Sequence, residues 1–378
     1  RSYAVQEVDS ESLTAAANPN VTSALQGKSA GVVVTNSGGI GGKPRIDIRG
    51  ASSLTGNDKL LWVIDGVPFS TEDTATDAQG LFGGTSNGGG YLDINPDDIE
   101  SMSVLKGGPA AALYGSRGAN GVVLITTKSG AKSKGLGISY TGSTTFSRAA
   151  YFLDLQREYG QGTNGVYDPQ SRVSWGPRFD GVERIAWTGE SLPYQAEDNL
   201  LEDFTRTGVS TRNNLIFTKG GEDGSFKVSI GKDKTEGVYD GFNVDRLNFD
   251  LRASYDINPW MNVDAKVSYI NTKGEGRPTI GVYSSVSDWN SMPANIRTRD
   301  LAPGFVFEDN QTREYLFGPS TILTENPNAD NRNPYFLRAS NFNSDERNRM
   351  FGYLATTFKF TDELSLKLKY GLDLYSCL

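Results

Sequence analysis

Histidine is absent from the 378 residues, and cysteine occurs once, at Cys377. Without histidine the chain cannot carry a Ser-His-Asp triad, a Cys-His pair or an imidazole metal ligand. A single cysteine forms no disulfide within the chain and no zinc site built from thiolates. We expect no enzyme active site and no cofactor. We also expect no bound metal, because the acidic residues, Asp73, Asp77 and Asp93 among them, show no EF-hand spacing.

A long apolar run and an excess of basic residues are also missing. No stretch of eighteen apolar residues is present, which argues against a transmembrane helix. Lys and Arg number 37 against 45 Asp and Glu, so the formal net charge is −8. A nucleic-acid partner would require a basic patch that displaces counterions from the phosphates, and we expect no such partner.

Glycine and aromatic side chains are abundant instead. The chain has 44 glycines, and aromatic residues make up 11% of it. Many turns combined with many aromatic side chains are typical of all-β proteins. The mean hydropathy of −0.43 resembles that of a soluble protein. It does not argue against a membrane barrel, because lipid-facing and lumen-facing residues alternate along each strand and the average stays polar.

Short apolar strands and glycine-rich turns fill the N-terminal third. Periodicity and turn signals predict five strands and one short helix in this part of the chain. The strands lie at 31–35, 45–50, 60–64, 99–105 and 122–127, and the helix at 109–114. The most distinctive sequence segments are LLWVIDGVPF at 60–69, DINPDDIESMSVLK at 93–106 and AAALYGSRGANGVVLITTK at 110–128. These segments resemble the plug domain of TonB-dependent outer-membrane transporters and are most similar to the SusC/RagA branch.

The resemblance implies an all-β-dominated fold, a transmembrane antiparallel β-barrel with an N-terminal α+β plug domain inside the lumen. The plug domain is expected at residues 1–132 and the N-terminal part of the barrel at 133–378. Barrels of this kind have about 22 strands. About seven strands are too few to close around such a plug, so we expect this chain to be part of a longer protein.

Residues beyond 133 alternate between apolar and polar in segments of about ten, as barrel strands do. In the clearest segment, 245–257, we expect Leu247 and Phe249 on the lipid side and Arg246 and Asp250 in the lumen. Seven such strands are predicted. They lie at 136–146, 213–219, 226–231, 245–257, 261–269, 354–360 and 364–374.

Long and short connections alternate between the predicted strands. Long extracellular loops are expected near 148–212 and 271–350, whereas 220–224, 258–260 and 361–363 are short. Bacterial barrels have short periplasmic turns and longer outer loops. This parity supports a barrel independently of the family resemblance.

The resemblance also implies a charged face on the plug that locks the plug against the barrel wall and takes part in gating. The candidates for this role are Arg49, Glu100, Lys106 and Arg117. Glu100 is on a predicted strand and would pair with Arg49 or Arg117; a solvated charged face is the alternative. Asp97, Asp98 and Glu100 form a carboxylate cluster, but acid–base catalysis would need carboxylates that face each other in a cleft.

A second group of candidates belongs to loops that would face the ligand. They are Ser37, Gly39, Lys43, Phe82, Tyr91 and Trp175. The ring of Trp175 would suit the apolar face of a sugar, although anchoring of its own loop is an equal alternative. The glycine-rich segment 37–43 is no P-loop, because Lys43 precedes Pro44 and a strand in place of Ser or Thr and a helix.

By resemblance the protein imports an oligosaccharide or a peptide nutrient across the outer membrane of a Gram-negative cell. The implied partners are the TonB-ExbB-ExbD energising complex, a SusD-like surface lipoprotein that acts as a lid, and outer-membrane lipid. The TonB-binding segment is expected near Arg1 or before it. The alternative is a SusC-like barrel that serves as a scaffold in a secretion or surface assembly complex. A secreted β-sandwich adhesin or hydrolase is a third hypothesis, which the missing histidine and the loop parity disfavour.

Overall fold

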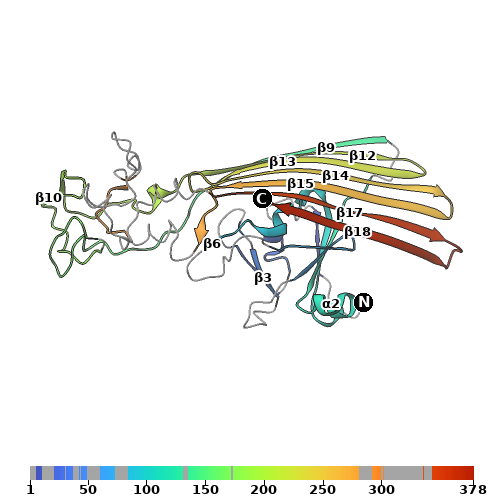
Figure 1. The fold of residues 1–378 in the computed structure, drawn as a ribbon, viewed down its shortest axis with the longest axis horizontal. Coiled ribbons are helices and arrows are strands. Elements are labelled where there is room, and N and C mark those ends of the chain that lie inside the picture. Colours follow the sequence, from blue (N-terminus) through green and yellow to red (C-terminus); the bar gives the residue numbers. More distant parts are fainter. Residues whose placement is uncertain are drawn as a thin grey trace.

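A seven-stranded curved sheet and a smaller plug packed against one of its faces make up most of the molecule (Figure 1). The computed structural model describes residues 6–10, 21–29, 31–36, 42, 44–48, 60–72, 84–130, 135–171, 173–280, 292–298, 301, 335 and 343–378. The predicted boundary at residues 132 and 133 lies outside these ranges and stays a prediction.

The seven-stranded sheet, which we call the wall, is antiparallel throughout and has the strand order β18-β17-β15-β14-β13-β12-β9. Its strands are β9 (Gly135–Ser147), β12 (Gly208–Gly220), β13 (Gly224–Glu236), β14 (Asn243–Asn258), β15 (Met261–Glu275), β17 (Ser344–Lys359) and β18 (Ser365–Cys377). All seven predicted barrel strands are confirmed, and each is longer than its sequence pattern indicated.

The two faces of the wall differ in the way that the alternation predicts. Leu247, Phe249 and Leu251 of β14 are 38–46% exposed on the outer face, whereas Arg246 and Asp250 are 5% exposed on the inner face. A strand puts successive side chains on opposite faces. The inner face is therefore polar and is covered by the plug, while the outer face carries the apolar side chains that lipid would contact.

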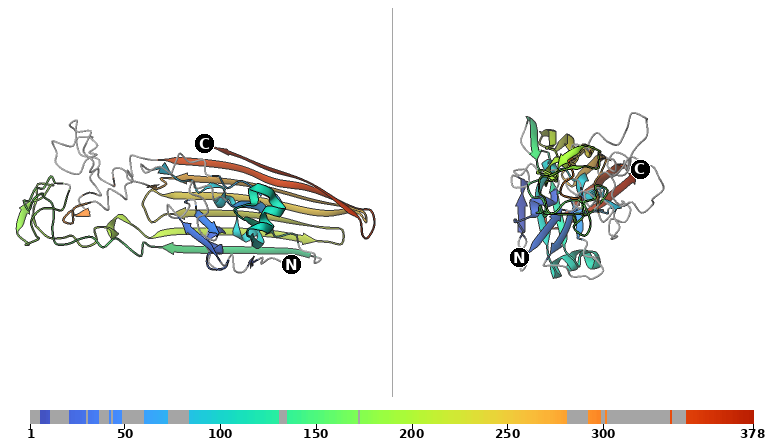
Figure 2. Two further views of the ribbon diagram at one scale, coloured as in Figure 1. Left: turned by 90° about the horizontal axis from the view of Figure 1, so that it is seen from below. Right: turned by 90° about the vertical axis from the view of Figure 1, so that its left-hand side faces the viewer.

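Short turns gather at one end of the wall and long connections at the other (Figures 1 and 2). Residues 221–223, 259–260 and 360–364 make the short turns at one end. The other end has the long connections 148–207 and 276–343, and between them in the chain the shorter connection 237–242. The predicted alternation of short turns at one end with longer connections at the other is confirmed. Within the described residues no helix is long and apolar enough to span a membrane.

The plug contains a five-stranded sheet of order β1-β7-β8-β4-β5, in which only β4 and β8 run parallel. Its strands are β1 (Gln6–Asp9), β4 (Leu61–Ile64), β5 (Val67–Phe69), β7 (Ile99–Leu105) and β8 (Val122–Thr127). Helix α2 (Gly108–Tyr114) follows β7, and β2 (Val32–Asn36) pairs with β3 (Pro44–Ile48) in a separate hairpin. The five predicted strands and the helix are present; β1 and β5 were not predicted.

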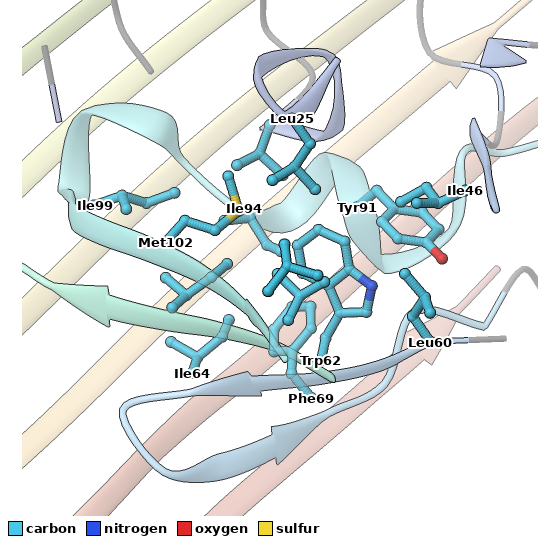
Figure 3. Close-up of a cluster of buried hydrophobic side chains, with 14 of the residues drawn as sticks. Leu25, Ile46, Leu60, Trp62, Ile64, Phe69, Tyr91, Ile94, Ile99 and Met102 are labelled. Carbon is cyan, nitrogen blue, oxygen red and sulfur yellow. The ribbon is translucent and has the colours of Figure 1, made fainter. Parts of the chain in front are cut away.

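The plug core forms around Trp62, which is fully buried and meets the ring of Tyr91 edge-on at 5.3 Å between centroids (Figure 3). This core continues into the wall, because Phe351, Tyr353 and other side chains of β17 belong to the same cluster. Apolar burial of this kind contributes roughly 25 cal/mol per Å². The plug and the wall are thus joined by a patch of shared core as well as by polar contacts.

The long connections form a separate unit beyond the end of the wall, where hairpin β10 (Glu183–Ile185) and β11 (Ser191–Pro193) lies (Figure 1). Its core includes Leu201, Phe204 and Ile296, so the two long connections pack on each other. One more contact joins the plug to the end of the wall from which the long connections extend. There β6 (Gly84–Thr85) of the plug pairs with β16 (Thr279–Ile280), which follows the wall strand β15.

Candidate functional site

Four carboxylates of the plug face the inner side of the wall, and the side chain of each is less than one-tenth exposed. They are Asp65, Asp93, Asp97 and Asp98. Isolated buried carboxylates are strongly disfavoured unless cations and hydrogen bonds surround them. Every one of the four meets a lysine or arginine of the wall. We call these contacts the plug–wall ion pairs.

The turn between β4 and β5 places Asp65. Asp65 and Gly66 both have positive φ, 49° and 83°, which a two-residue hairpin turn of the primed type requires. The carboxylate then accepts hydrogen bonds from the backbone N–H (2.9 Å) and hydroxyl (2.7 Å) of Thr127 on β8. The Asp-Gly signal therefore fixes both the turn and the direction of the acid.

A single helical turn places Asp97 and Asp98. Asn95 caps the 3₁₀ helix Pro96–Asp98, because its side-chain oxygen accepts the N–H of Asp97 at 3.1 Å. Proline at the first helical position has its φ already set for the turn. The amide nitrogen of Asn95 donates to Asp98 at 2.9 Å, which orients that carboxylate.

Asp93 is shared by two arginines of β17. Arg347 lies 2.8 Å and Arg349 3.1 Å from its two oxygens, and Thr272 of β15 donates a hydrogen bond at 3.2 Å. Arg349 also pairs with the wall residue Asp373 at 2.6 Å. The side chains of Asp93 and Arg349 are each 1% exposed. Removal of one partner from such a buried pair typically costs about 3–5 kcal/mol.

Arg347 and Arg349 also hold the plug backbone. Arg347 donates to the carbonyl of Gly89 at 2.6 Å, and Arg349 donates to that of Ser70 at 2.8 Å. An added Cβ on Gly90 would lie 2.2 Å from the Ser70 oxygen and 2.6 Å from an Arg349 nitrogen. Only glycine fits at this position, so the glycine run before Asp93 allows the arginines to approach.

Asp97 and Asp98 contact the next strands along the wall. Asp97 lies 2.9 Å from Arg212 of β12, and Asp98 lies 2.7 Å from Lys227 of β13. Lys227 is fully buried and also lies 3.2 Å from Asp250 of β14. Two adjacent plug acids thus meet cations on two adjacent wall strands.

Asp65 closes the set on β15. Lys266 lies 3.1 Å from its carboxylate and 3.5 Å from Asp250, so Asp250 connects the two wall lysines. Arg252 is 4.0 Å from Asp65 and donates to the carbonyl of Thr127 at 3.0 Å. A continuous buried series of opposite charges therefore runs from Asp98 through the wall to Asp65.

Two of the plug acids have shifted pKa values, in opposite directions. Burial opposes ionisation of Asp65, yet Lys266, two hydrogen bonds from Thr127 and Arg252 together hold its pKa below the ordinary value. Burial raises the pKa of Asp97 above the ordinary value, with neighbouring Asp98 acting in the same direction, although Arg212 opposes the shift. The plug–wall ion pairs are therefore unequal in strength.

A cavity of about 50 Å³ lies between plug and wall. Its polar lining includes Asp98, Asp250, Lys266 and Asn248. Asn248 is 4% exposed, and neither its amide nitrogen nor its oxygen has a hydrogen-bond partner in the described ranges. A polar cavity of this size has room for a few water molecules.

The predicted locking residues lie elsewhere on the plug. Glu100 and Arg117 are exposed, and neither is among the plug side chains that pair with the wall in the described part of the chain. Lys106 is half-buried on the segment that follows β7. Arg49 lies outside the described residues. A role for these four in gating stays a prediction.

The predicted ligand-facing residues divide in a similar way. Ser37, Gly39, Lys43 and Phe82 lie outside the described residues. Trp175 is 71% exposed in the first long connection. Tyr91 was wrongly assigned to a ligand-facing loop: it is 6% exposed and packs in the plug core, because the turn Gly89–Asp93 directs its ring onto Trp62.

Neither Asp65 nor Asp93 is among the locking residues predicted from the sequence, and Asp97 and Asp98 were predicted only as candidates for acid–base chemistry. A usable signal was present on the other side of the interface. Lys227, Arg252 and Lys266 fall at lumen-facing positions of predicted strands, where buried cations require counterions. Among the described residues no group of three or more potential metal-binding acids or cysteines occurs.

Comparison with known proteins agrees with this geometry. Residues 2–122 match the family model for the TonB-dependent Receptor Plug Domain. Over 368 residues the chain is 28% identical to the TonB-dependent receptor SusC of Bacteroides thetaiotaomicron, a match that covers 94% of this chain and 33% of SusC. The chain belongs to the SusC/RagA family of TonB-dependent receptors. It is part of an outer-membrane protein.

Other relatives of this SusC/RagA receptor agree. TonB-dependent receptor P26 of Formosa agariphila is 41% identical over 308 residues, which are 76% of this chain and 28% of P26. The fold is that of the RagAB peptide importer in its "open-open" state, with a TM-score of 0.70 at 23% identity, over 99% of this chain and 40% of the RagAB chain. The chain thus spans about a third of the length of SusC and a smaller share of P26.

Proposed function

We propose that the full-length receptor imports an oligosaccharide or a peptide across the outer membrane, driven through TonB and closed from outside by a SusD-like lipoprotein. The observation that carries this proposal is the set of plug–wall ion pairs. A plug that must leave and return needs contacts that water can replace. Charged groups rehydrate strongly once they are exposed, whereas apolar core exposed to water gains no such compensation.

The position of β1 supports an energised release that starts at the N-terminal side. Among the described strands β1 is an edge strand of the plug sheet and pairs with β7, with Gln6 opposite Val104 and Asp9 opposite Ser101. β7 begins at Ile99, directly after Asp98. A pull that arrives through the N-terminal segment therefore reaches β7 and then the pairs of Asp97 and Asp98 with the wall.

The outer connections support a lid. Val166, Trp175 and Ile185 are 58–71% exposed on the first long connection. Exposed apolar side chains mark an interaction site where they form a contiguous patch, and these three are the positions that a lid would cover. The RagAB complex, whose fold this chain shares, is named as a peptide importer, which makes a peptide one of the two substrate classes to test.

The test is uptake by cells that express the full-length receptor with its neighbouring lipoprotein. Labelled oligosaccharides and peptides are supplied to cells with and without TonB, and to cells that lack the lipoprotein. We expect one ligand class to enter, with entry abolished by loss of TonB and strongly reduced by loss of the lipoprotein. No TonB-dependent entry of either class, together with co-purification of secretion components, would instead support the scaffold function.

A further inference from the structure

Three cations stand side by side on the inner face of the wall. Lys227 of β13 lies directly opposite Arg252 of β14, and Arg252 lies directly opposite Lys266 of β15. Like charges at opposite positions of neighbouring strands repel each other and destabilise a sheet. We call these three residues the cationic row. Such a row requires counterions, and the structure shows where they come from.

The plug supplies two of the counterions. Asp98 lies 2.7 Å from Lys227, and Asp65 lies 3.1 Å from Lys266. The wall supplies the others: Asp250 lies between the two lysines, and Asp264 pairs with Arg252 at 3.1 Å. With the plug in place the cationic row has four carboxylates around it. Without the plug, two of these four carboxylates remain beside the three cations of the row.

The plug footprint as a whole has the same imbalance. Seven wall cations within it form ion pairs in the described ranges, and four wall carboxylates pair with them, which leaves three positive charges for the plug acids to balance. The seven cations are Arg212, Lys227, Arg246, Arg252, Lys266, Arg347 and Arg349, and the wall carboxylates are Asp233, Asp250, Asp264 and Asp373. An eighth wall cation, Lys369, donates to the backbone carbonyl of Asp65. A water-lined passage with walls of one sign concentrates ligands of the opposite sign.

We propose that the cationic row binds carboxylate groups of the transported ligand once the plug has moved, so that the ligand is an anionic chain. This inference rests on the proposed function and names the chemistry of its substrate. In the closed state the carboxylates of Asp65 and Asp98 occupy the positions that ligand carboxylates would take. The backbones of Lys227 and Lys266 are two strands apart, about 10 Å, and both ammonium groups reach Asp250 between them. The amide of Asn248 lies beside Asp250 in the same cavity and has no hydrogen-bond partner among the described residues, so it can hydrogen-bond to the ligand backbone.

Two variants of the full-length receptor separate this binding function from mere locking of the plug. Asp98→Asn removes the plug acid and leaves the row intact. Asp98→Asn with Lys227→Met removes both members of the pair, so that no buried charge is orphaned and the row loses one cation. Lys273→Met is the matched control, because Lys273 is on the same sheet but 56% exposed at a distance from the row.

The readout is the ratio of TonB-dependent uptake for matched ligands with and without carboxylates. One pair consists of a uronic-acid oligosaccharide and a neutral one of equal length; the other consists of a peptide with acidic side chains and its amide counterpart. We expect the wild type, Asp98→Asn and Lys273→Met to favour one anionic ligand. In the double variant the ratio of charged to neutral ligand uptake should fall about tenfold. The ligand pair whose ratio falls identifies whether the carboxylate belongs to a sugar or to a peptide.

Equal uptake of charged and neutral ligands by the wild type would overturn the inference and leave the proposed function standing. The same conclusion would follow if the single and the double variant showed the same ratio, since the row would then act only as part of the lock. TonB-dependent uptake of neither ligand pair would overturn the proposed function, and this inference with it.

Discussion

Asp93→Asn removes the one plug carboxylate that two wall arginines share. Arg347 then loses its plug carboxylate and keeps the Gly89 carbonyl, while Arg349 keeps Asp373 and the Ser70 carbonyl. Breaking a buried pair by loss of one partner costs about 3–5 kcal/mol. The ratio of docked to undocked plug should therefore fall roughly 100- to 4000-fold.

Thiol labelling measures this ratio. Ser229 is fully buried on the inner face of β13, next to Asn214, which accepts a hydrogen bond from Asn95 of the plug. In the full-length receptor with Cys377→Ser, a Ser229→Cys reporter reacts with a maleimide only while the plug is undocked. We expect Asp93→Asn to raise the labelling rate by the factor given above.

Asp264→Asn is the control for this prediction. Asp264 pairs with Arg252 at 3.1 Å with 18% side-chain exposure, and both residues belong to the wall. Its loss breaks an ion pair without removing a plug carboxylate, so the labelling rate should change less than tenfold. A labelling rate for Asp93→Asn equal to that of the wild type would refute the claim that these ion pairs hold the plug.

Three further outcomes follow from the same geometry. Gly90→Ala should lower the free energy of unfolding by about 1–3 kcal/mol through overpacking, whereas Gly108→Ala, whose Cβ meets nothing within 4 Å, should not; thermal unfolding distinguishes them. Thr85→Cys with Thr279→Cys, in a background without the native cysteine, should form a disulfide between β6 and β16, because the two residues are directly opposite; a band shift on non-reducing gels detects it. The lowered pKa of Asp65 means that its stabilisation is present above about pH 3.9 and is lost as pH falls through the folded-state pKa. The melting temperature of Asp65→Asn should therefore fall less steeply across that acid range than the melting temperature of the wild type.

Alternation along the chain was sufficient to predict the wall. In β14 the apolar and polar positions alternate without interruption from Leu247 to Tyr255, and a strand with this period has only one way to direct its apolar side chains to one face. The connection lengths then gave the two ends of the sheet. Strand ends were less certain, since the strands extend into polar residues such as Asn243 and Glu275.

The locking residues could not be found in the same way. β7 places Ile99 and Glu100 on opposite faces, and its sequence does not say which face meets the wall. The structure buries Ile99 and exposes Glu100, while Asp97 and Asp98 precede the strand in a helical turn. Which plug acid meets which wall cation depends on docking of residues more than a hundred positions apart, for example Asp97 and Arg212. Local sequence patterns contain no information about contacts between residues that are so far apart in the chain.

A reversible cross-link between plug and wall tests the central claim most directly. A Cβ on Gly371 of β18 would lie 3.2 Å from the Cβ of Val67 on β5, close to the separation of about 3.8 Å in disulfides. In the full-length receptor with Cys377→Ser, Val67→Cys and Gly371→Cys should together form a disulfide that stops TonB-dependent uptake, and reductant should restore it. Each single variant should transport. Undiminished uptake by the fully cross-linked receptor would contradict the account, because the plug would then not have to leave the wall.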